Sequence, residues 1–364
     1  MNNDTKYAKA NEERKKYVDK ILSSDSPKKI VVAGAGTGKT YLFKEILKDK
    51  NKSLTLTFIN ALVEDLSLEL CGLSDVKTLH SFARGFLSRI TKKGIKMFPK
   101  LQEVIKEDAK VLLDAEVDFN NLFNNREDES EYIAFYKKRK KYYGNYYGYS
   151  DVIFAVVKFF EKYKDRIPSY EQVLVDEFQD FNKLEVSLID LLAEKNQILL
   201  AGDDDQSLYI FKNATPEPIR QRHSDTNTNY ESFSLPYCSR CTKVIIDATN
   251  DIINEATKNG NLVGRSKKDY LYFEDEGKDK ICENHPKVIY TQLFDKQIPW
   301  FIEQQINSIA EEERKEFSVL IISPLKTQYR YIAESFKKKG FKNVNFAEKK
   351  GDGGVVLLDG LKIL

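Results

Sequence analysis

Two short strings in the sequence carry acidic and amide side chains directly after apolar runs. "LVDEFQD" contains Asp176 and Glu177, and "AGDDDQ" ends on Gln206. Carboxylates at the end of an apolar strand cost desolvation free energy unless a cation compensates them. We therefore expect Asp176 to hold a hydrated Mg²⁺ ion and Glu177 to orient and deprotonate an attacking water. An N-cap role in the helix expected next accounts for Asp180, but not for the other two acids.

A glycine-rich string, "AGAGTGKT", lies between the apolar run "KIVV" and the helix-forming run "YLFKEILKDK". In that position backbone N–H groups can close around a phosphate chain at a helix N-terminus. Lys39 would neutralise the β- and γ-phosphates, and the Thr40 hydroxyl would ligate Mg²⁺. The residues expected to hold the nucleotide are Gly34, Ala35, Gly36, Thr37, Gly38, Lys39 and Thr40. A turn without a ligand is the alternative, because Ala33 replaces the glycine of the strict pattern.

The elements that must position these residues alternate between short apolar strands and long amphipathic helices. The expected strands are "KKIVVAGAG", "KSLTLTFIN", "QVLVDE" and "NQILLAGD", followed later by "KVIYTQ" and "SVLIISP". Such near-continuous apolar strands are typical of a parallel sheet that helices cover on both faces. The expected fold class is therefore α/β with a doubly wound parallel sheet, in which ligands bind at the carboxyl ends of the strands.

Changes in this pattern divide the chain into expected domains. Residues 1–94 and 169–232 form one α/β domain, and residues 95–168, rich in charge, Tyr and Phe, form a helical insertion within it. A second α/β domain is expected over residues 233–364, because "YESFSLPYCSR" has the composition of another strand and "TKVIIDATNDIINEA" has the period of a helix.

The overall composition sets outer limits on function. The 364 residues include 41% hydrophobic side chains, enough for a sizeable core. Lys and Arg number 58 against 56 Asp and Glu, a formal net charge of +2, so a polyanion would be held by local basic patches. No signal-like segment opens the chain, and no run approaches the roughly 18 to 20 apolar residues of a membrane span. A soluble, cytoplasmic protein without a membrane partner is expected.

The four cysteines are too few and too scattered for a disulfide scaffold and are expected to be reduced. Cys238 and Cys241 form a CxxC pair, and Cys282 and His285 repeat its two-residue gap, so a Cys3His zinc site is conceivable. The separation of about 40 residues between the two pairs counts against zinc.

Taken together and in this order, the strings resemble the UvrD/Rep-like helicases of superfamily one. "AGAGTGKT" looks like motif I of that family, "TFINAL" like Ia, "TLHSF" like Ib, "LVDEFQD" like II, "GDDDQSLYIF" like III and "LPYCSR" like IV. The resemblance implies two RecA-like domains with ATP and Mg²⁺ in the cleft between them and a nucleic-acid strand across their tops. The catalytic residues that it implies are Lys39, Asp176, Glu177, Gln206 and, from the second domain, Arg240.

The same resemblance implies contacts with single-stranded DNA, with RNA left open. The residues at those positions are Phe58, Asn60, His80, Tyr209 and Phe211. Without the resemblance, Phe58 would be a core residue and His80 a packing or helix-start histidine.

A basic and aromatic run, "KKRKKYYGNYYGY", opens with Lys137, Lys138 and Arg139 inside the expected insertion. Its cations could follow a phosphate backbone while its tyrosines stack on bases, each stack contributing on the order of 1 to 3 kcal/mol. A solvated helix face is the alternative interpretation.

The sequence also departs from the family pattern around the base of the nucleotide. Arg14 stands where relatives usually have an adenine-reading glutamine, and Ser239 stands where they have a stacking tyrosine. We therefore expect weak discrimination between ATP and other NTPs, with Arg14 and Tyr237 near the base and Tyr17 as another stacking candidate. In the "TFINAL" string, Ile59 replaces a threonine hydroxyl, which predicts lower strand affinity.

The chain ends at "DGLKIL", before the motifs V and VI expected in the family. An arginine finger is worth roughly 10³ to 10⁵ in turnover, so the chain is expected to bind nucleotide better than it hydrolyses it. Either a protein partner or a missing C-terminal continuation is expected to complete the second, incomplete RecA-like domain.

Three functions remain open from the sequence. The first is an ATP-dependent single-stranded-DNA translocase or helicase, as the front part of a longer protein. The second is a nucleotide-gated module that senses nucleic acid or recruits an effector without unwinding. The third, a P-loop ATPase unrelated to nucleic acid, is disfavoured by the combination of motifs.

Overall fold

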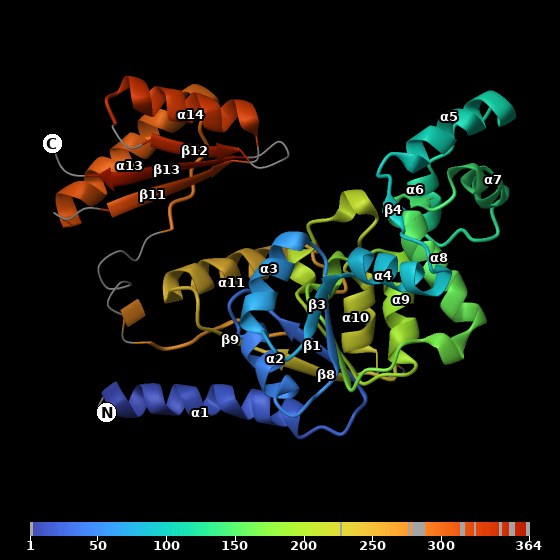
Figure 1. The fold of residues 1–364 in the computed structure, drawn as a ribbon. Helices are drawn as coiled ribbons and strands as arrows, with labels where there is room; N and C mark the ends of the chain where they lie inside the picture. Colours follow the sequence, from blue (N-terminus) through green and yellow to red (C-terminus); the bar gives the residue numbers. More distant parts are fainter. Residues whose placement is uncertain are drawn as a thin grey trace. The chain divides into compact units, whose positions relative to one another are not determined.

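The computed structural model describes residues 3–225, 228–275, 277–278, 288–313, 317–323, 325–341, 344–348 and 354–361 (Figure 1). The chain divides into two compact units, Met1–Val288 and Ile289–Leu364. Among the described residues, no helix has the length and apolar character that crossing a membrane requires.

A six-stranded sheet forms the centre of the first unit. Its strands are β1 (Lys28–Ala33), β2 (Ser53–Thr57), β3 (Asp75–Thr78), β6 (Gln172–Val175), β7 (Ile198–Gly202) and β8 (Glu231–Leu235). They lie in the order β3-β2-β6-β7-β1-β8, and every neighbouring pair is parallel. The expected parallel sheet is confirmed. Strand β3 was not anticipated, because "DVKT" is too polar and short to give an apolar strand signal.

Helices cover both faces of this sheet (Figure 1). Alternate residues of β1 face opposite sides: Ile30 and Val32 belong to one core, and Val31 and Ala33 to the other. The first core is completed by α4 (Leu79–Thr91), α8 (Tyr149–Lys162), α9 (Lys183–Ala193) and α10 (Glu217–Ser224). The second is completed by α1 (Asn3–Leu22), α2 (Lys39–Leu47) and α3 (Asn60–Glu69). This two-residue alternation is that of a sheet buried on both sides, so the doubly wound α/β fold class is confirmed.

The stretch expected as an insertion is mainly helical and extends away from the sheet (Figure 1). Before α8 it contains α5 (Leu101–Leu113), α6 (Phe119–Asn124) and α7 (Glu131–Lys140). A short parallel pair, β4 (Lys96–Met97) with β5 (Tyr146–Tyr147), closes its base. Single 3₁₀ turns follow α7 and α8 at Lys141–Tyr143 and Lys164–Arg166.

The second domain was expected to begin at residue 233, and the structure differs there. Phe233 lies in β8, which pairs with β1, and its buried side chain packs in the core with α1 and α2. The first unit continues through β9 (Tyr237–Cys238), α11 (Lys243–Lys258) and β10 (Leu271–Tyr272). The compact units divide after Val288, and Phe233 and Leu235 of β8 belong to the core formed with α1, α2 and α3.

The second unit contains a small sheet whose topology also differs from expectation. Its elements are η6 (Asp295–Gln297), α13 (Ile298–Glu313), β11 (Phe317–Ser323), α14 (Lys326–Lys338), β12 (Val344–Glu348) and β13 (Gly354–Leu361). Strand β13 lies between β11 and β12 and is antiparallel to both. The connection over 349–353 is too short for the crossover that parallel strands need. The strand expected at "KVIYTQ" is wrong for its described residues 288–292, which form no strand.

Candidate functional site

The glycine-rich loop lies between β1 and α2, at the carboxyl end of a central strand. Gly36 has φ +69° and Gly38 has φ +97°, both in the left-handed region that glycine adopts at little cost. The buried Thr37 hydroxyl donates a hydrogen bond to the Gly34 carbonyl at 2.9 Å, which closes the loop on itself. Lys39 is the first residue of α2 and Thr40 the second, so both lie at the start of the helix, directly after the loop.

The two carboxylates at the end of β6 meet this lysine. Lys39 Nζ lies 2.7 Å from Glu177 Oε1 and 3.9 Å from Asp176 Oδ1. Glu177 has φ +51°, a left-handed conformation that costs a non-glycine residue about 1 kcal/mol or more and that clusters at functional sites. This left-handed residue turns the chain directly after β6, and the Glu177 side chain contacts Lys39 next to the loop.

Asp176 has the properties of a cation ligand. It is only 6% exposed, and its Oδ1 atom is buried without a hydrogen-bond partner among the described residues. A buried carboxylate oxygen without a partner is costly, and oxygen ligands of this type suit Mg²⁺. Asp176 therefore fits a magnesium ligand, and Thr40, the residue after Lys39, is the second ligand that the sequence predicts.

The two acids differ in their electrostatics. Burial raises the pKa of Asp176 to about 6, an effect that the nearby Lys39 ammonium partly opposes. Burial also disfavours the charged form of Glu177, but Lys39 and a hydrogen bond from Gln179 outweigh it and hold the pKa of Glu177 below its ordinary value. Glu177 is therefore a carboxylate at neutral pH, which is the form that can accept a proton from water.

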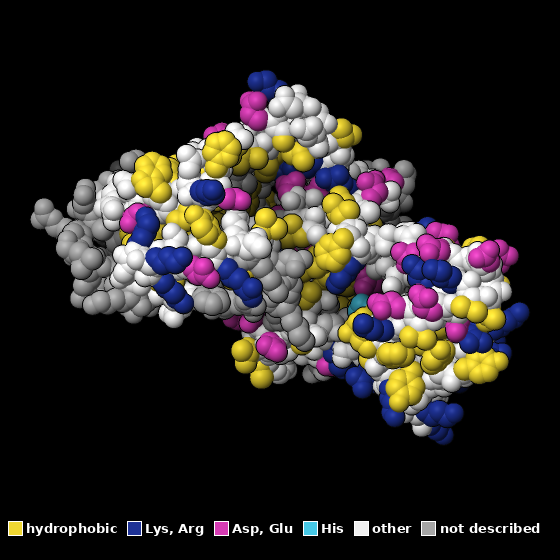
Figure 2. All heavy atoms as spheres, turned by 90° about the horizontal axis from the view of Figure 1, so that it is seen from above, with side chains coloured by type: hydrophobic (Ala, Val, Ile, Leu, Met, Phe, Trp, Pro, Cys, Tyr) yellow, Lys and Arg dark blue, Asp and Glu magenta, His cyan; other side chains and the backbone are white. Residues whose placement is uncertain are grey.

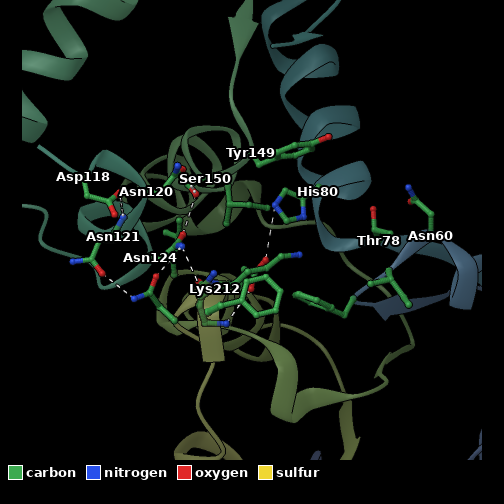
Figure 3. Close-up of a pocket in the computed structure, with 18 residues that line it drawn as sticks. Asn60, Thr78, His80, Asp118, Asn120, Asn121, Asn124, Tyr149, Ser150 and Lys212 are labelled. Atoms are coloured by element: carbon green, nitrogen blue, oxygen red, sulfur yellow. Dashed lines mark hydrogen bonds and ion pairs between the residues drawn. The ribbon is translucent and has the colours of Figure 1, made fainter. Parts of the chain in front are cut away.

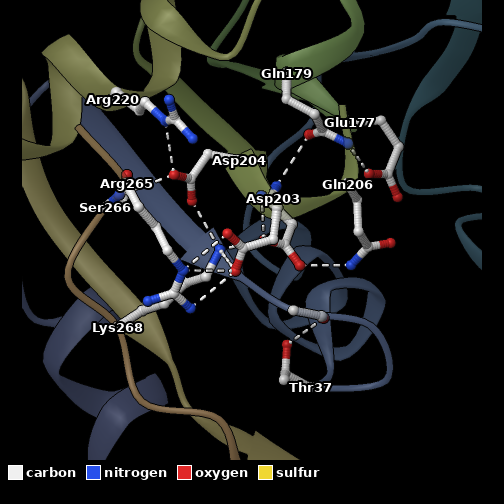
Figure 4. Close-up of polar contacts among 12 residues, drawn as sticks. Thr37, Glu177, Gln179, Asp203, Asp204, Gln206, Arg220, Arg265, Ser266 and Lys268 are labelled. Carbon is white, nitrogen blue, oxygen red and sulfur yellow. Dashed lines mark hydrogen bonds and ion pairs between the residues drawn. The ribbon is translucent and has the colours of Figure 1, made fainter. Parts of the chain in front are cut away.

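Gln179 connects the β6 carboxylates to the string that follows β7 (Figure 4), a role that the sequence patterns do not predict. Its Nε2 donates to Glu177 Oε2 at 2.9 Å, and its Oε1 accepts the backbone N–H of Asp203 at 3.0 Å. It is 1% exposed. Gln206 lies on the short 3₁₀ helix η4 (Asp204–Gln206) and donates from Nε2 to Asp203 Oδ2. The signal in the sequence was the single amide among the acids of "LVDEFQD".

A turn after β9 contacts the outer side of the glycine-rich loop. The backbone N–H and the hydroxyl of Ser239 both donate to the Gly36 carbonyl, at 2.9 and 3.1 Å. The Tyr270 hydroxyl donates to the Ala35 carbonyl at 3.0 Å. Arg240 is exposed beside Gly36 and contributes to lowering the pKa of Glu177. The expected site residues 34–40, Asp176, Glu177, Gln206 and Arg240 are thus brought together.

The residues expected near the base form a second layer beside the loop. Arg14 places its guanidinium near Gly38 and stacks over the Phe273 ring at 5.3 Å. The rings of Tyr17 and Tyr237 meet edge to face at 5.9 Å, and the Tyr237 hydroxyl donates to Glu13 Oε2 at 2.9 Å. Burial and this carboxylate raise the pKa of Tyr237 to about 12.

Aromatic side chains that were expected to contact a nucleic-acid strand form a cluster. Phe58 packs against Tyr209 with ring centroids 4.5 Å apart, and Tyr209 against Phe211 at 5.7 Å. Lys212 lies over all three rings, at 4.7 Å from the centroid of Phe58, 5.2 Å from Tyr209 and 5.9 Å from Phe211. Phe211 is 77% exposed. An exposed ring beside a lysine suits base stacking and phosphate contact.

A pocket of about 670 Å³ adjoins this cluster and contains two more of the expected residues, Asn60 and His80 (Figure 3). His80 meets Tyr149 edge to face at 5.5 Å, and on the other side lie Asn120, Asn121 and Asn124. Burial lowers the pKa of His80 to about 4, so its imidazole is neutral at pH 7. Burial also raises the pKa of Glu185, 3.9 Å from His80, to about 7.

The basic run begins on α7 and continues through the 3₁₀ turn at Lys141–Tyr143 and β5 to Tyr149, which opens α8 and lines the pocket. Lys137 lies over the Phe154 ring at 5.1 Å, and Arg139 pairs with Asp108 at 2.8 Å. Lys138 is exposed. Lys137 and Arg139 therefore make contacts within the insertion itself. Basic and acidic side chains are interspersed over the face seen in Figure 2, as the small net charge leads one to expect.

Two further expectations have different outcomes. The N-cap of α9 is Asn182, which forms a capping box with Glu185, so the capping role considered for Asp180 is wrong. Asp180 instead accepts a hydrogen bond from the backbone N–H of Leu208 at 3.4 Å.

The zinc hypothesis concerns Cys238, Cys241 and residues 282 and 285. Cys238 is buried, and the backbone N–H of Cys241 donates to its sulfur, while residues 282 and 285 lie outside the described residues.

Comparison with known proteins gives consistent matches. A family model described as the UvrD/REP helicase N-terminal domain matches residues 42–227. DNA helicase II of Haemophilus influenzae is 29% identical over 192 aligned residues, and the match covers 51% of this chain and 24% of that protein. ATP-dependent DNA helicase PcrA of Staphylococcus epidermidis (strain RP62A) is 23% identical over 362 residues, covering 85% of this chain and 47% of that protein. A structure of unliganded Pif1 from Bacteroides sp covers 84% of this chain and 58% of that chain, with 14% identity and a TM-score of 0.33. The chain spans about half or less of the length of these curated relatives.

Proposed function

Because the family model matches more than half of the chain, the protein belongs to the UvrD/REP helicase N-terminal domain family, and we propose that it hydrolyses ATP to translocate along single-stranded DNA. The six-stranded sheet would be the first RecA-like domain, with residues 95–168 as its insertion. The relatives that are named as ATP-dependent DNA helicases support this proposal.

The observation that carries the proposal is the meeting of three strand ends at one place. The glycine-rich loop, the Asp176–Glu177 pair and the Asp203–Gln206 string follow β1, β6 and β7, which are neighbours in the sheet. Ligands of open parallel sheets bind at this edge. A phosphate chain, a cation and a water-activating carboxylate would therefore be held within one small volume.

We assign the following roles within that volume. Backbone N–H groups of the loop bind the phosphates, and Lys39 moves from Glu177 onto the β- and γ-phosphate oxygens. Asp176 and Thr40 hold Mg²⁺, which when bound neutralises phosphate charge. Glu177, released from Lys39, orients the attacking water and takes its proton.

The remaining assignments concern the terminal phosphate and the base. Gln206 and Arg240 contact the γ-phosphate. Arg14 and Tyr237 lie toward the base, and the absence of an adenine-reading glutamine supports weak selection among NTPs.

For the nucleic acid, we assign the aromatic cluster and the adjoining pocket as the path of the strand. Phe58, Tyr209 and Phe211 offer stacking faces, and Asn60 and His80 line the pocket beside them. Lys212 supplies positive charge at the same place. Lys137 and Lys138, two exposed cations of the basic run, would contact phosphates from the insertion.

The proposal is tested by ATP turnover with and without single-stranded oligonucleotides of DNA and RNA, followed by unwinding of a tailed duplex. We expect DNA to stimulate turnover and Lys39→Ala to abolish it. Glu177→Gln is expected to retain nucleotide binding while losing turnover, which separates the chemistry from binding. Stimulated turnover without unwinding would favour a nucleotide-gated module. Turnover that persists in Lys39→Ala would refute the nucleotide site.

A further inference from the structure

A segment outside the strings that define the nucleotide site is bound to the three aspartates that follow β7 (Figure 4). Arg265, Ser266 and Lys268 come from the connection between α11 and β10, about 60 residues further along the chain. Arg265 pairs with Asp205 at 2.8 Å, and the Ser266 N–H donates to Asp204 at 2.8 Å.

Lys268 is the central cation of this cluster. Its side chain is 6% exposed, and its ammonium pairs with Asp203, with Asp204 at 2.7 Å and with Asp205 at 3.0 Å. The three carboxylates lie close enough together to hold a cation. The lysine ammonium occupies that position, so a metal ion is not needed there.

The three aspartates do not depend on Lys268 equally. Asp204 also pairs with Arg220 at 3.0 Å, and Asp205 with Arg265. Within the described residues, Lys268 is the only cation paired with Asp203. Loss of the Lys268 ammonium would thus affect Asp203 more than its neighbours.

Asp203 is also the aspartate that contacts the proposed site. Lys268 binds its Oδ1 atom, while its Oδ2 atom accepts the hydrogen bond from Gln206 Nε2. Its backbone N–H is held by Gln179, which in turn contacts Glu177. The Asp203 carboxylate therefore lies between the buried Lys268 and Gln206, the residue expected to contact the γ-phosphate.

The connection that carries Lys268 is anchored at a second point. Two residues beyond Lys268, the Tyr270 hydroxyl donates to the Ala35 carbonyl in the glycine-rich loop at 3.0 Å. The stretch from Arg265 to Tyr270 thus contacts both the acidic string after β7 and the loop after β1. Its backbone has little freedom to carry Lys268 away from Asp203.

We propose that Lys268 is a positioning residue of the nucleotide site: it orients the Asp203 carboxylate, and Asp203 orients the Gln206 amide toward the γ-phosphate. This inference rests on the proposed function. Lys268 itself touches no phosphate. Its effect is on how well the site distinguishes a triphosphate from a diphosphate, because only the triphosphate offers the group that Gln206 contacts.

The test compares the affinities of the full chain for ADP and for a nonhydrolysable ATP analogue, in the presence of Mg²⁺. Lys268→Met removes the charge at similar length, and Lys268→Arg restores it. The control is Lys267→Met, because Lys267 is exposed and forms no hydrogen bond or ion pair with the described part of the chain. We expect Lys268→Met to reduce the preference for the triphosphate about tenfold, the worth of one hydrogen bond to a charged group. Lys267→Met should stay within about twofold of the wild type, as exposed substitutions usually do. Lys268→Arg keeps the positive charge and should retain more of the triphosphate preference than Lys268→Met.

A purely structural role for Lys268 would give a different result. Loss of folded protein weakens both affinities by the same factor and leaves their ratio unchanged, so an unchanged ratio in Lys268→Met overturns the proposal. A double-mutant cycle with Gln206→Ala adds a second criterion. If Lys268 acts through Gln206, the double variant has the same preference for the triphosphate over the diphosphate as Gln206→Ala alone. If the two substitutions each reduce this preference independently, so that their factors multiply, Lys268 does not act through Gln206.

The same titrations distinguish failure of the proposed nucleotide site from failure of the role proposed for Lys268. If Lys39→Ala leaves both affinities unchanged, or if the wild type binds neither nucleotide, the nucleotide site itself is refuted and the role of Lys268 falls with it. If Lys39→Ala loses affinity while Lys268→Met keeps the wild-type ratio, only the positioning role is refuted.

Discussion

Gln179 shows how much a single buried amide can determine at the residue scale. It holds Glu177 with its donor and the Asp203 backbone with its acceptor, so it links the residues after β6 to those after β7. Its two partners come from different strings of the sequence. The amide stands out among the acids of its own string, but neither string identifies Asp203 as its partner, because the bridge exists only when β6 and β7 lie side by side.

We expect Gln179→Met to lower both stability and turnover. The substitution keeps the side-chain volume but leaves the buried Asp203 N–H without its acceptor, at a cost of about 1 to 3 kcal/mol in the free energy of unfolding. Glu177 also loses a hydrogen bond that favours its charged form. Denaturant unfolding and ATP turnover measure the two effects.

The control for this substitution is Gln221→Met, since Gln221 is exposed on α10. It should change the free energy of unfolding by about 0.5 kcal/mol or less. Equal stabilities of Gln179→Met and the wild type would show that the bridge contributes nothing.

At the scale of elements, the glycine-rich loop is held from outside by the turn after β9. A Cβ atom on Gly36 would lie 2.4 Å from the Arg240 Cβ, so the two backbones approach as closely as they do only because residue 36 has no side chain. Gly72 offers a contrast: it too has a positive φ, +76°, but a Cβ there would meet nothing within 4 Å.

Substituting alanine at these two glycines separates backbone strain from contact. Gly72→Ala should cost roughly 1 to 2 kcal/mol of stability, the price of a left-handed conformation for alanine. Gly36→Ala should incur that strain and also displace the turn, and we expect it to weaken ATP binding about tenfold or more, which is roughly 1.4 kcal/mol. Titration with a fluorescent ATP analogue measures the affinity. Equal ATP affinities of the two variants would contradict the importance of the close approach.

The helical insertion contains a buried acid that the proposed mechanism does not use. Asp151, on α8, is 4% exposed, and neither carboxylate oxygen has a hydrogen-bond partner within the described chain. Burial raises its pKa to about 7, although the nearby Lys140 opposes the shift. Tyr136 and Tyr147 face the same group.

The insertion is therefore expected to become less stable as pH rises. Between the ordinary pKa of 3.8 and about 7, Asp151 is ionised in the unfolded chain but protonated in the folded one, so unfolding releases a proton and stability falls with increasing pH. Asp151→Asn removes this term. We expect the stability of the variant relative to the wild type to increase by roughly 2 to 3 kcal/mol from pH 5 to pH 8, measured by urea unfolding. A difference that does not change with pH would argue against a buried, titrating Asp151.

At the scale of the whole molecule, every residue that we assign to the nucleotide site lies in the first compact unit. The site runs from Arg14 on α1 to Tyr270 before β10, and the unit extends to Val288. The second unit has its own core around Tyr329 and Phe336.

We accordingly expect a fragment of residues 1–288 to fold cooperatively and to bind ATP within about threefold of the full chain, a difference of roughly 0.6 kcal/mol. Circular dichroism and nucleotide titration are the measurements. A fragment that folds but fails to bind ATP would show that residues 289–364 contribute to the site.

The sequence by itself determined the strands β1, β2, β6 and β7, the glycine-rich loop and the carboxylates after β6. Local patterns specify these features, since apolar runs require burial and a turn of this shape requires glycine. The sequence also predicted that the residues after β1, β6 and β7 would lie together, because parallel strands bring their carboxyl ends to one edge.

Only the tertiary structure decided which distant groups support that edge. Lys268, Tyr270 and Gln179 act on partners in other elements, and β8 joins the first sheet although the sequence placed it in a second domain. The physical reason is that ion pairs, bridging hydrogen bonds and shared cores depend on distances between segments far apart along the chain. Local composition does not contain those distances.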